Sequence, residues 1–310
     1  MAKRFILYLQ VFATSFFWGI SFVAITSTLE VIDYVEMLAT RWSFAAITVI
    51  VLYFLGIIKL NYKNKGVFAL VILSLFEPCL YSIFEVLGLM NTSASQTSLV
   101  LALIPVFVTI GYAYFFKVKI RITTILAIIV CLIGVSFTIV FEDGFTFSKD
   151  YLGYLYLLMA ILSATGYVLS SAKLSVKFTP IEITSAMVFT GAIFFNVYAF
   201  IKKGSFDMYV KTFTNLHAFL GVAFLGIFCS VLCFLLYNNI VSKVPASIVS
   251  VLIGNSVMIV GVISGVIING DSFSIYKFSG VVITLIGIII VNLNSVNRSN
   301  KIYNNTFNYK

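Results

Sequence analysis

Residues 122–141 read ITTILAIIVCLIGVSFTIVF, an uninterrupted apolar run that contains no charged side chain. About 20 apolar residues in a helix are enough to cross a hydrocarbon core of about 30 Å. Similar stretches recur along the whole chain, separated by short polar joints. The predicted spans are 5–28, 34–58, 66–89, 93–116, 122–141, 152–173, 180–201, 217–239, 246–268 and 276–294. The pattern predicts an all-α integral membrane protein with ten transmembrane helices.

The composition points the same way. Hydrophobic residues make up 61% of the 310 residues and charged residues only 10%, whereas a soluble domain carries about 25% charged residues. The net charge of +9 comes without a basic patch interleaved with aromatic residues. We therefore expect a lipid bilayer as partner and no nucleic acid. Lys3 and Arg4 precede the first span as in a signal peptide, but the span is too long for one and lacks a clear cleavage site, so it predicts a retained helix.

The charges in the joints predict an orientation. With the N-terminus in the cytoplasm, most basic residues fall on the cytoplasmic side, which the positive-inside rule favours. Arg41 remains within the membrane, and the basic residues assigned to the outside are Lys149, Lys202, Lys203, Lys211 and Lys277. An odd helix count would destroy this asymmetry. We expect a multi-pass protein of the plasma (inner) membrane with cytoplasmic N- and C-termini and a polar cytoplasmic tail, 295–310.

The chain also repeats itself in order. Ala94-Ser95 opens the fourth predicted helix and Ala246-Ser247 opens the ninth, while the sequences around Gly134 and Gly287 match in the fifth and tenth. These matches predict two units, 1–145 and 146–294, of five helices each. Because five is odd, the second unit enters from the opposite side of the membrane. Such inverted repeats are typical of secondary transporters.

Three further motifs carry a family resemblance. They are FWGISF at 17–22, GLMNTSAS at 88–95, and SL at 98–99 followed by LIPVF at 103–107. Over residues 8–294 the chain resembles the EamA-type branch of the drug/metabolite transporter superfamily, as two tandem repeats. The resemblance implies transport of metabolites such as amino acids or related compounds, often as export. The segment Phe116-Lys117-Val118-Lys119 departs from the family pattern because it lacks an acid after the fourth helix.

The third predicted helix contains an unusual polar stripe. Glu77, Tyr81 and Glu85 are four residues apart and share one helical face. Ionisable groups inside a bilayer are costly, so they mark candidate functional sites. Glu85 has two interpretations, a substrate or proton site and a structural ion pair with Arg41. Glu77 has no evident cationic partner, which favours binding of an amine or coupling to protons.

Other residues add candidates for the binding site and for hinges. Trp18 and Tyr167 lie mid-helix at equivalent positions of the two units, while Gln96 and Asn255 offer hydrogen-bonding groups. Each of these could instead serve packing or bonding between helices. Proline interrupts helical hydrogen bonding, so Pro78 and Pro105 are either hinges or fixed kinks. Gly261 and Gly265 form a Gly-x-x-x-Gly pair that indicates close packing within the chain or, alternatively, a homodimer.

The sequence lacks the machinery of several other classes. No phosphate-binding glycine loop is present, and His217 is the only histidine. The four cysteines lie in apolar stretches and predict packing rather than a metal site. We therefore expect neither an enzyme nor a cofactor or metal, but a secondary transporter of a small zwitterionic or cationic organic solute. A membrane-embedded enzyme and a non-transporting sensor or channel are the alternatives.

Overall fold

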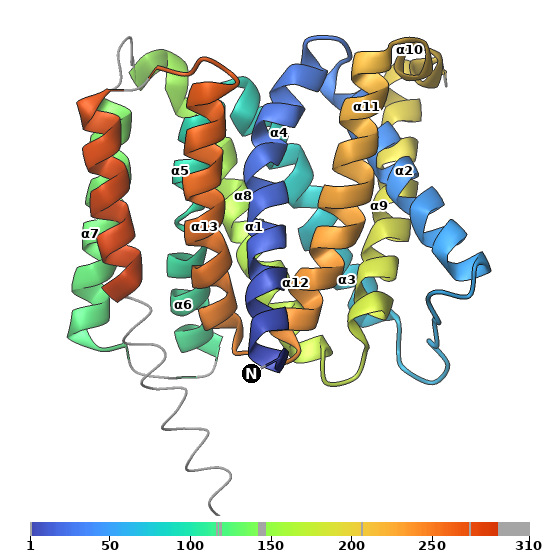
Figure 1. Cartoon of the computed structure of the whole chain (residues 1–310), viewed down its shortest axis with the longest axis horizontal. Coiled ribbons are helices and arrows are strands. Elements are labelled where there is room, and N and C mark those ends of the chain that lie inside the picture. The colour runs from blue at the N-terminus through green and yellow to red at the C-terminus, as the bar shows by residue number, and fades with distance from the viewer. Residues whose placement is uncertain are drawn as a thin grey trace, which may run out of the picture.

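The computed structural model describes residues 2–115, 117, 120–141, 147–205, 207–272 and 274–290, and within these ranges it consists of helices and loops. The predicted tail 295–310 and the end of the last predicted span lie outside the described residues. The helices stand roughly side by side (Figure 1). The first described residue of the chain, Ala2, lies at the lower end of the molecule in this view, and the last described helix runs from the upper end downwards.

The first half of the chain forms eight helical elements. They are α1 (Ala2–Leu29), α2 (Tyr34–Phe54), α3 (Phe68–Ser74), η1 (Leu75–Leu80), α4 (Tyr81–Met90), α5 (Ala94–Leu101), α6 (Ile104–Phe115) and α7 (Ile122–Val140). The second half continues with α8 (Phe147–Leu174), α9 (Pro180–Lys203), α10 (Met208–Thr214), α11 (Leu216–Phe224), η2 (Leu225–Leu232), α12 (Cys233–Val241) and α13 (Ala246–Ile267). A final helix covers Ile275–Ile290.

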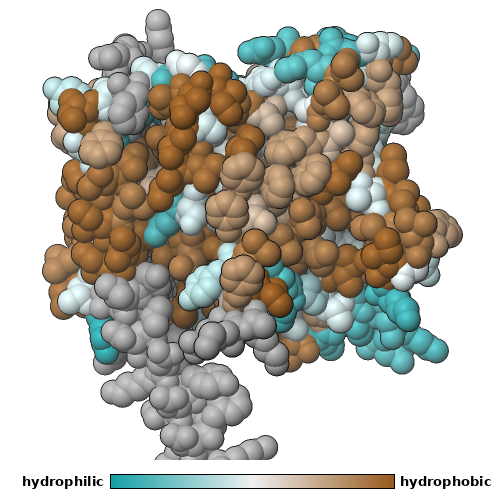
Figure 2. All heavy atoms as spheres, viewed as in Figure 1, coloured by the Kyte–Doolittle hydropathy of each residue, from teal (hydrophilic) through white to brown (hydrophobic). Residues whose placement is uncertain are grey.

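Within the described residues, nine helical stretches are long and apolar enough to cross a membrane. The final helix is apolar but shorter, so the predicted count of ten depends on it. Brown, hydrophobic residues cover the middle of the face in Figure 2, and hydrophilic residues gather at its upper and lower right. This distribution is the one that a bilayer requires, because the hydrocarbon core cannot hydrate polar side chains.

Three of the predicted helices are not continuous α-helices. The third span passes through the π-helical segment η1, where Glu77 takes an extended backbone conformation (φ −139°, ψ 115°) and is followed by Pro78. The eighth span contains a second π-helical segment, η2. The fourth span is also divided, since α5 ends at Leu101 and α6 resumes at Ile104, next to Pro105. These breaks occur where proline or π geometry disturbs the regular hydrogen-bond ladder.

Helices from the two halves pack against each other throughout the molecule. Figure 1 shows α1 beside α13, and α2 packs against α9 and α4 against α8. Ion pairs join both ends of the α2–α9 seam. Lys203 contacts Asp33 and lies 3.4 Å from the Glu36 carboxylate, while Lys65, in the loop after α2, lies 2.7 Å from Glu182.

The glycine pair of the ninth predicted helix packs inside the chain. A Cβ on Gly261 would lie 2.4 Å from the Ser98 Cβ, and a Cβ on Gly265 would lie 2.8 Å from the Ser95 backbone nitrogen. These glycines therefore let α13 approach α5 closely, which is the packing interpretation of the motif. The homodimer stays a prediction that this contact does not support.

Candidate functional site

A cavity of about 110 Å³ lies between helices of both halves of the chain. A single water needs roughly 10–15 Å³, so this space is large enough for several waters or for part of a small organic molecule. Its walls come from α1, α2, η1, α4, α5, α6, α8, α12 and α13. Six of the residues predicted from the sequence line it, namely Trp18, Arg41, Glu77, Tyr81, Glu85 and Tyr167.

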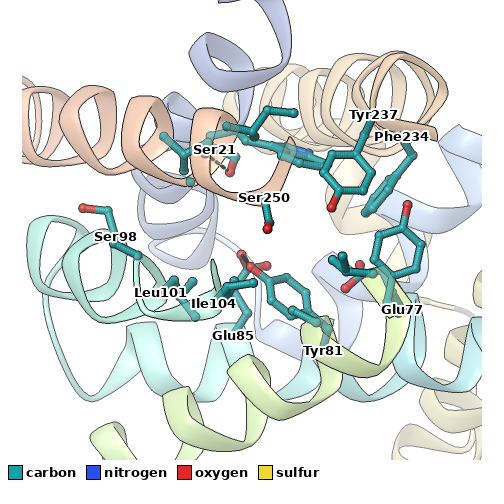
Figure 3. A pocket seen from close by; sticks show the side chains of 18 of the residues that line it. Ser21, Glu77, Tyr81, Glu85, Ser98, Leu101, Ile104, Phe234, Tyr237 and Ser250 are labelled. Atoms are coloured by element: carbon teal, nitrogen blue, oxygen red, sulfur yellow. Dashed lines mark hydrogen bonds between the residues drawn. The ribbon is translucent and has the colours of Figure 1, made fainter. Parts of the chain in front are cut away.

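The polar stripe of the third span forms one wall of the cavity (Figure 3). The Tyr81 hydroxyl donates a hydrogen bond of 2.9 Å to the Glu85 carboxylate. Glu77 is only 3% exposed, and its carboxylate has no hydrogen bond or ion pair with any part of the chain that the structure describes. The change of backbone at η1 presents Glu77 to the cavity. The two acids therefore differ, because Glu85 has a partner among the described residues and Glu77 has none there.

Arg41 does not pair with Glu85 as the structural interpretation of that residue expected. Its Nε donates to the Ser230 hydroxyl at 2.9 Å, and its guanidinium lies 5.5 Å from the centre of the Trp42 ring. The buried Nη1 atom has no hydrogen-bond partner among the described residues. Ser230 belongs to η2, so this π-helical segment provides the position where the cation is held. Sequence periodicity alone could not show this contact between distant helices.

Four aromatic side chains form a closed cluster at the cavity. Trp18 contacts Phe234 and Tyr237, with ring centres 5.2 and 5.5 Å apart, and Tyr167 contacts the same two rings at 5.8 Å each. Trp18 and Tyr167 were predicted from the sequence, whereas Phe234 and Tyr237 were missed. Their position on one face of α12, three residues apart, is a helical spacing that could have suggested them.

Hydrogen bonds to the protein fix two of these rings. The Trp18 indole nitrogen donates to the Cys229 carbonyl of η2 at 3.0 Å. The Tyr167 hydroxyl donates to Asn238 Oδ1 at 2.9 Å, and Ser171 donates to the same oxygen at 2.7 Å. Asn238 is fully buried and was not predicted. Its role is to position Tyr167, since its amide joins α12 to α8.

Two predicted binding residues do not line the cavity. The Gln96 side chain instead accepts a hydrogen bond from the Ser93 backbone nitrogen, closing a capping box at the start of α5. Asn255 is half-buried, and its Oδ1 atom has no hydrogen-bond partner among the described residues. The α13 residues that line the cavity are spaced as one helical face, and Asn255 is not among them: Ser250, Ile253, Gly254 and Val257. Asn255 consequently points elsewhere, so its predicted binding role lacks structural support.

The two predicted hinge prolines occupy different settings. Pro78 is buried within η1, directly after Glu77, and a Cβ on Gly191 of α9 would lie 2.6 Å from its ring. Pro105 stands in the first turn of α6, next to the break in the fourth span, and lies close to Gly254 of α13. Both prolines therefore border the cavity wall at an irregular segment, and their movement stays a prediction.

The arrangement suits binding and release of a solute. Acidic, basic and hydroxyl groups share a small space with aromatic surfaces, and both halves contribute to it. Concave, mostly apolar sites with a few polar groups are the general form of small-molecule sites. The cavity also lies between the two halves of the chain, and transporters with repeated halves bind their substrate at the interface between the repeats.

Comparison with known proteins identifies the family. The model of the EamA-like transporter family matches residues 5–140 and again 151–293. The chain is 28% identical to the "Uncharacterized transporter YcxC" of Bacillus subtilis (strain 168), over 93% of each chain. It is 26% identical to an "Uncharacterized transporter" of Archaeoglobus fulgidus, covering 89% of this chain and 94% of the relative. A solved crystal structure, 17% identical, shares the fold with a TM-score of 0.68 over 93% of this chain and 96% of that chain. The resemblance drawn from the sequence is thus confirmed, and the chain belongs to the EamA-like transporter family.

Proposed function

We propose that this membrane transporter moves a small organic metabolite, an amino acid or a related zwitterionic or cationic solute, across the plasma membrane by alternating access. Export is the direction that we propose. The observation that carries the proposal is the cavity between the two halves, into which the unpartnered Glu77 carboxylate projects. In our interpretation Glu77 binds the amine of the solute or couples its movement to protons.

The inverted repeat is part of this proposal. The π-helical segments η1 and η2 begin at Leu75 and Leu225, which lie at equivalent places in the third and eighth spans. The separate family matches to 5–140 and 151–293 also support two related halves. With the final helix, Ile275–Ile290, counted as a crossing, each half has five crossings and the two halves are inverted. Both termini would then be cytoplasmic.

Transport by purified protein in proteoliposomes tests the function. Vesicles loaded with unlabelled amino acids should accumulate external labelled amino acid by counterflow, since a carrier exchanges solute in both directions. We expect Glu77→Gln to abolish exchange or to uncouple it from a pH gradient while the protein still folds. Wild-type exchange by that variant, with and without the gradient, would contradict the role of Glu77. Single-channel currents in place of saturable counterflow would favour the alternative of a channel, and neither activity would favour a sensor.

A further inference from the structure

The aromatic cluster of Trp18, Tyr167, Phe234 and Tyr237 offers mainly ring surfaces to the cavity. The Trp18 N–H and the Tyr167 O–H both bond to protein acceptors. Phe234 has no polar atom to offer. These four side chains can therefore attract a ligand through their rings, and aromatic rings attract cations within about 6 Å of their centres.

Two polar groups beside these rings have no partner in the described part of the chain. Tyr237 is only 3% exposed, and its buried hydroxyl has no hydrogen bond to any described residue. The Glu77 side chain lines the same cavity, and in the view of Figure 3 both side chains lie toward the same side of it. A buried acceptor and a buried hydroxyl left unbonded are unfavourable, so a ligand that carries hydrogen-bond donors would stabilise them.

The remaining charges of the cavity are engaged to different degrees. Glu85 accepts a hydrogen bond from Tyr81. Arg41 donates to Ser230 through Nε, and its Nη1 has no hydrogen-bond partner within the ranges that the structure describes. Arg41 is therefore the alternative recognition group to Glu77, because a ligand carboxylate could bind to its guanidinium. A solute bound mainly by Glu77 would carry a cation, whereas a solute bound mainly by Arg41 would carry an anion.

We propose that the cavity recognises its solute through an ammonium group, held by the Glu77 carboxylate and the rings of Trp18, Tyr167, Phe234 and Tyr237. This inference rests on the proposed function and narrows its substrate class. The carboxylate supplies the counter-charge, and the rings replace part of the water around the cation. The Tyr237 hydroxyl accepts a hydrogen bond from the ammonium group. A carboxylate on the solute is not required for binding.

Binding in detergent tests this with three probes of matched size: benzylamine, benzyl alcohol and benzoate. The chain has two tryptophans, and Trp42 is fully buried, with no hydrogen bond from its indole nitrogen to any described residue. The variant Trp42→Phe therefore leaves Trp18, inside the cavity, as the single tryptophan whose fluorescence reports binding. We expect benzylamine to bind at least about ten-fold more tightly than the neutral and anionic probes, as a charge-assisted hydrogen bond predicts. Equal binding of benzyl alcohol, or tighter binding of benzoate, overturns the proposal.

Substitutions in the same background locate the ammonium group. Glu77→Gln should weaken benzylamine binding by at least about ten-fold and leave benzyl alcohol binding within about two-fold. Tyr237→Phe should weaken benzylamine binding by a smaller factor. Glu85→Gln is the matched control, and it should weaken benzylamine binding less than Glu77→Gln does. A larger loss in Glu85→Gln than in Glu77→Gln contradicts the assignment. If Glu77→Gln does not fold, the comparison of the three probes in the protein that retains Glu77 and Glu85 still tests the preference for an ammonium group.

Failure of this inference is distinguishable from failure of the proposed function. The fluorescence titration measures binding without any membrane, whereas counterflow measures transport. A protein that exchanges solute but prefers benzoate refutes the ammonium site and keeps the transporter. A protein that binds benzylamine with the expected preference but shows no counterflow retains the site and refutes solute exchange.

Discussion

At the scale of single residues, Asp33 fixes the start of α2 in two ways. Its carboxylate accepts hydrogen bonds from the backbone nitrogens of Val35 and Glu36 at 2.9 and 3.1 Å, and it contacts Lys203 of α9. Burial would raise the pKa of this carboxyl, but the hydrogen bonds from Lys203 and Glu36 outweigh it and hold the pKa below its usual value. The native state therefore favours the ionised form.

Replacing Asp33 should separate the cap from the ion pair. We expect Asp33→Ala to lower the free energy of unfolding by about 1 kcal/mol, the typical loss for an N-cap. Asp33→Asn keeps the cap acceptor and should lose less, since exposed ion pairs contribute about 0–1 kcal/mol. Thermal unfolding in detergent at pH 7 measures both, and an equal loss in the two variants would contradict the capping role.

The pH dependence of Asp33 follows from the direction of its pKa shift. Because the native pKa is the lower one, the stabilisation is complete above the unfolded value of about 3.9 and disappears as pH falls through the native value. The stability difference between wild type and Asp33→Asn should therefore be constant near neutral pH and shrink in strong acid. Unfolding curves over a pH series check this, and a difference that grows towards acid would be the wrong sign.

Asn238 is the second residue whose loss should be measurable. Its amide accepts from Tyr167 and Ser171 and donates to Thr184 at 3.0 Å. Asn238→Ala leaves buried hydroxyls unbonded, so we expect a loss of about 1–3 kcal/mol in the free energy of unfolding. The neighbouring Asn239, with a hydrogen bond of 3.1 Å to Gln10, is the matched control. Denaturant titration of both alanine variants tests this, and an equal loss would contradict the network.

At the scale of elements, α7 and the final helix Ile275–Ile290 interlock through small residues. A Cβ on Gly134 would lie 2.6 Å from the Thr284 backbone nitrogen, and a Cβ on Gly287 would lie 2.8 Å from that of Cys131. Backbone contacts this close leave no side chain that can move aside. The matching sequences around Gly134 and Gly287, first seen as a repeat, thus occupy one shared interface.

Substituting one of these glycines should loosen the helix pair. We expect Gly134→Ala to lower the free energy of unfolding by about 1–3 kcal/mol, the usual loss on overpacking. Gly111→Ala is the control, because its nearest contact, at 2.9 Å, is the flexible end of the Leu169 side chain. Thermal unfolding of the two variants compares them directly. A loss in Gly111→Ala as large as in Gly134→Ala would show that backbone contact is not the cause.

How far the sequence predicts these elements depends on which interactions define them. Apolar length alone predicts every long span, because a bilayer imposes that length. A kink at Pro78 was predicted, but the π-helical geometry of η1 and the break at Leu225–Leu232 were not, since π-helical geometry depends on contacts with other helices. The same limit applies at the site. Glu77 and Trp18 were identifiable as polar or amphipathic groups in mid-membrane, whereas the Arg41–Ser230 bond joins residues far apart in sequence.

At the scale of the whole molecule, α1 and α2 contact the second half of the chain through bonds of different kinds. Lys203 and Lys65 hold α2 and α9 together by charge at opposite ends. Helix α1 meets the second half at its ends through neutral hydrogen bonds, such as the one of 3.2 Å between Thr26 and Asn269. Charge-assisted hydrogen bonds are about twice as strong as neutral ones. We therefore expect the α1 side to open during transport, while the ion-paired α2–α9 contact stays closed.

Cross-linking tests this division of the molecule. Cysteines at Thr26 and Asn269, joined by a short bifunctional thiol reagent, should stop counterflow because α1 can no longer leave the second half. Cysteines at Ser43 and Asn196, whose side chains lie 2.8 Å apart across the α2–α9 seam, form the matched control and should leave transport within about two-fold. The four native cysteines are buried and should contribute little background. Normal exchange after complete linkage of Thr26 to Asn269, or arrest only by the Ser43–Asn196 linkage, would place the moving seam between α2 and α9.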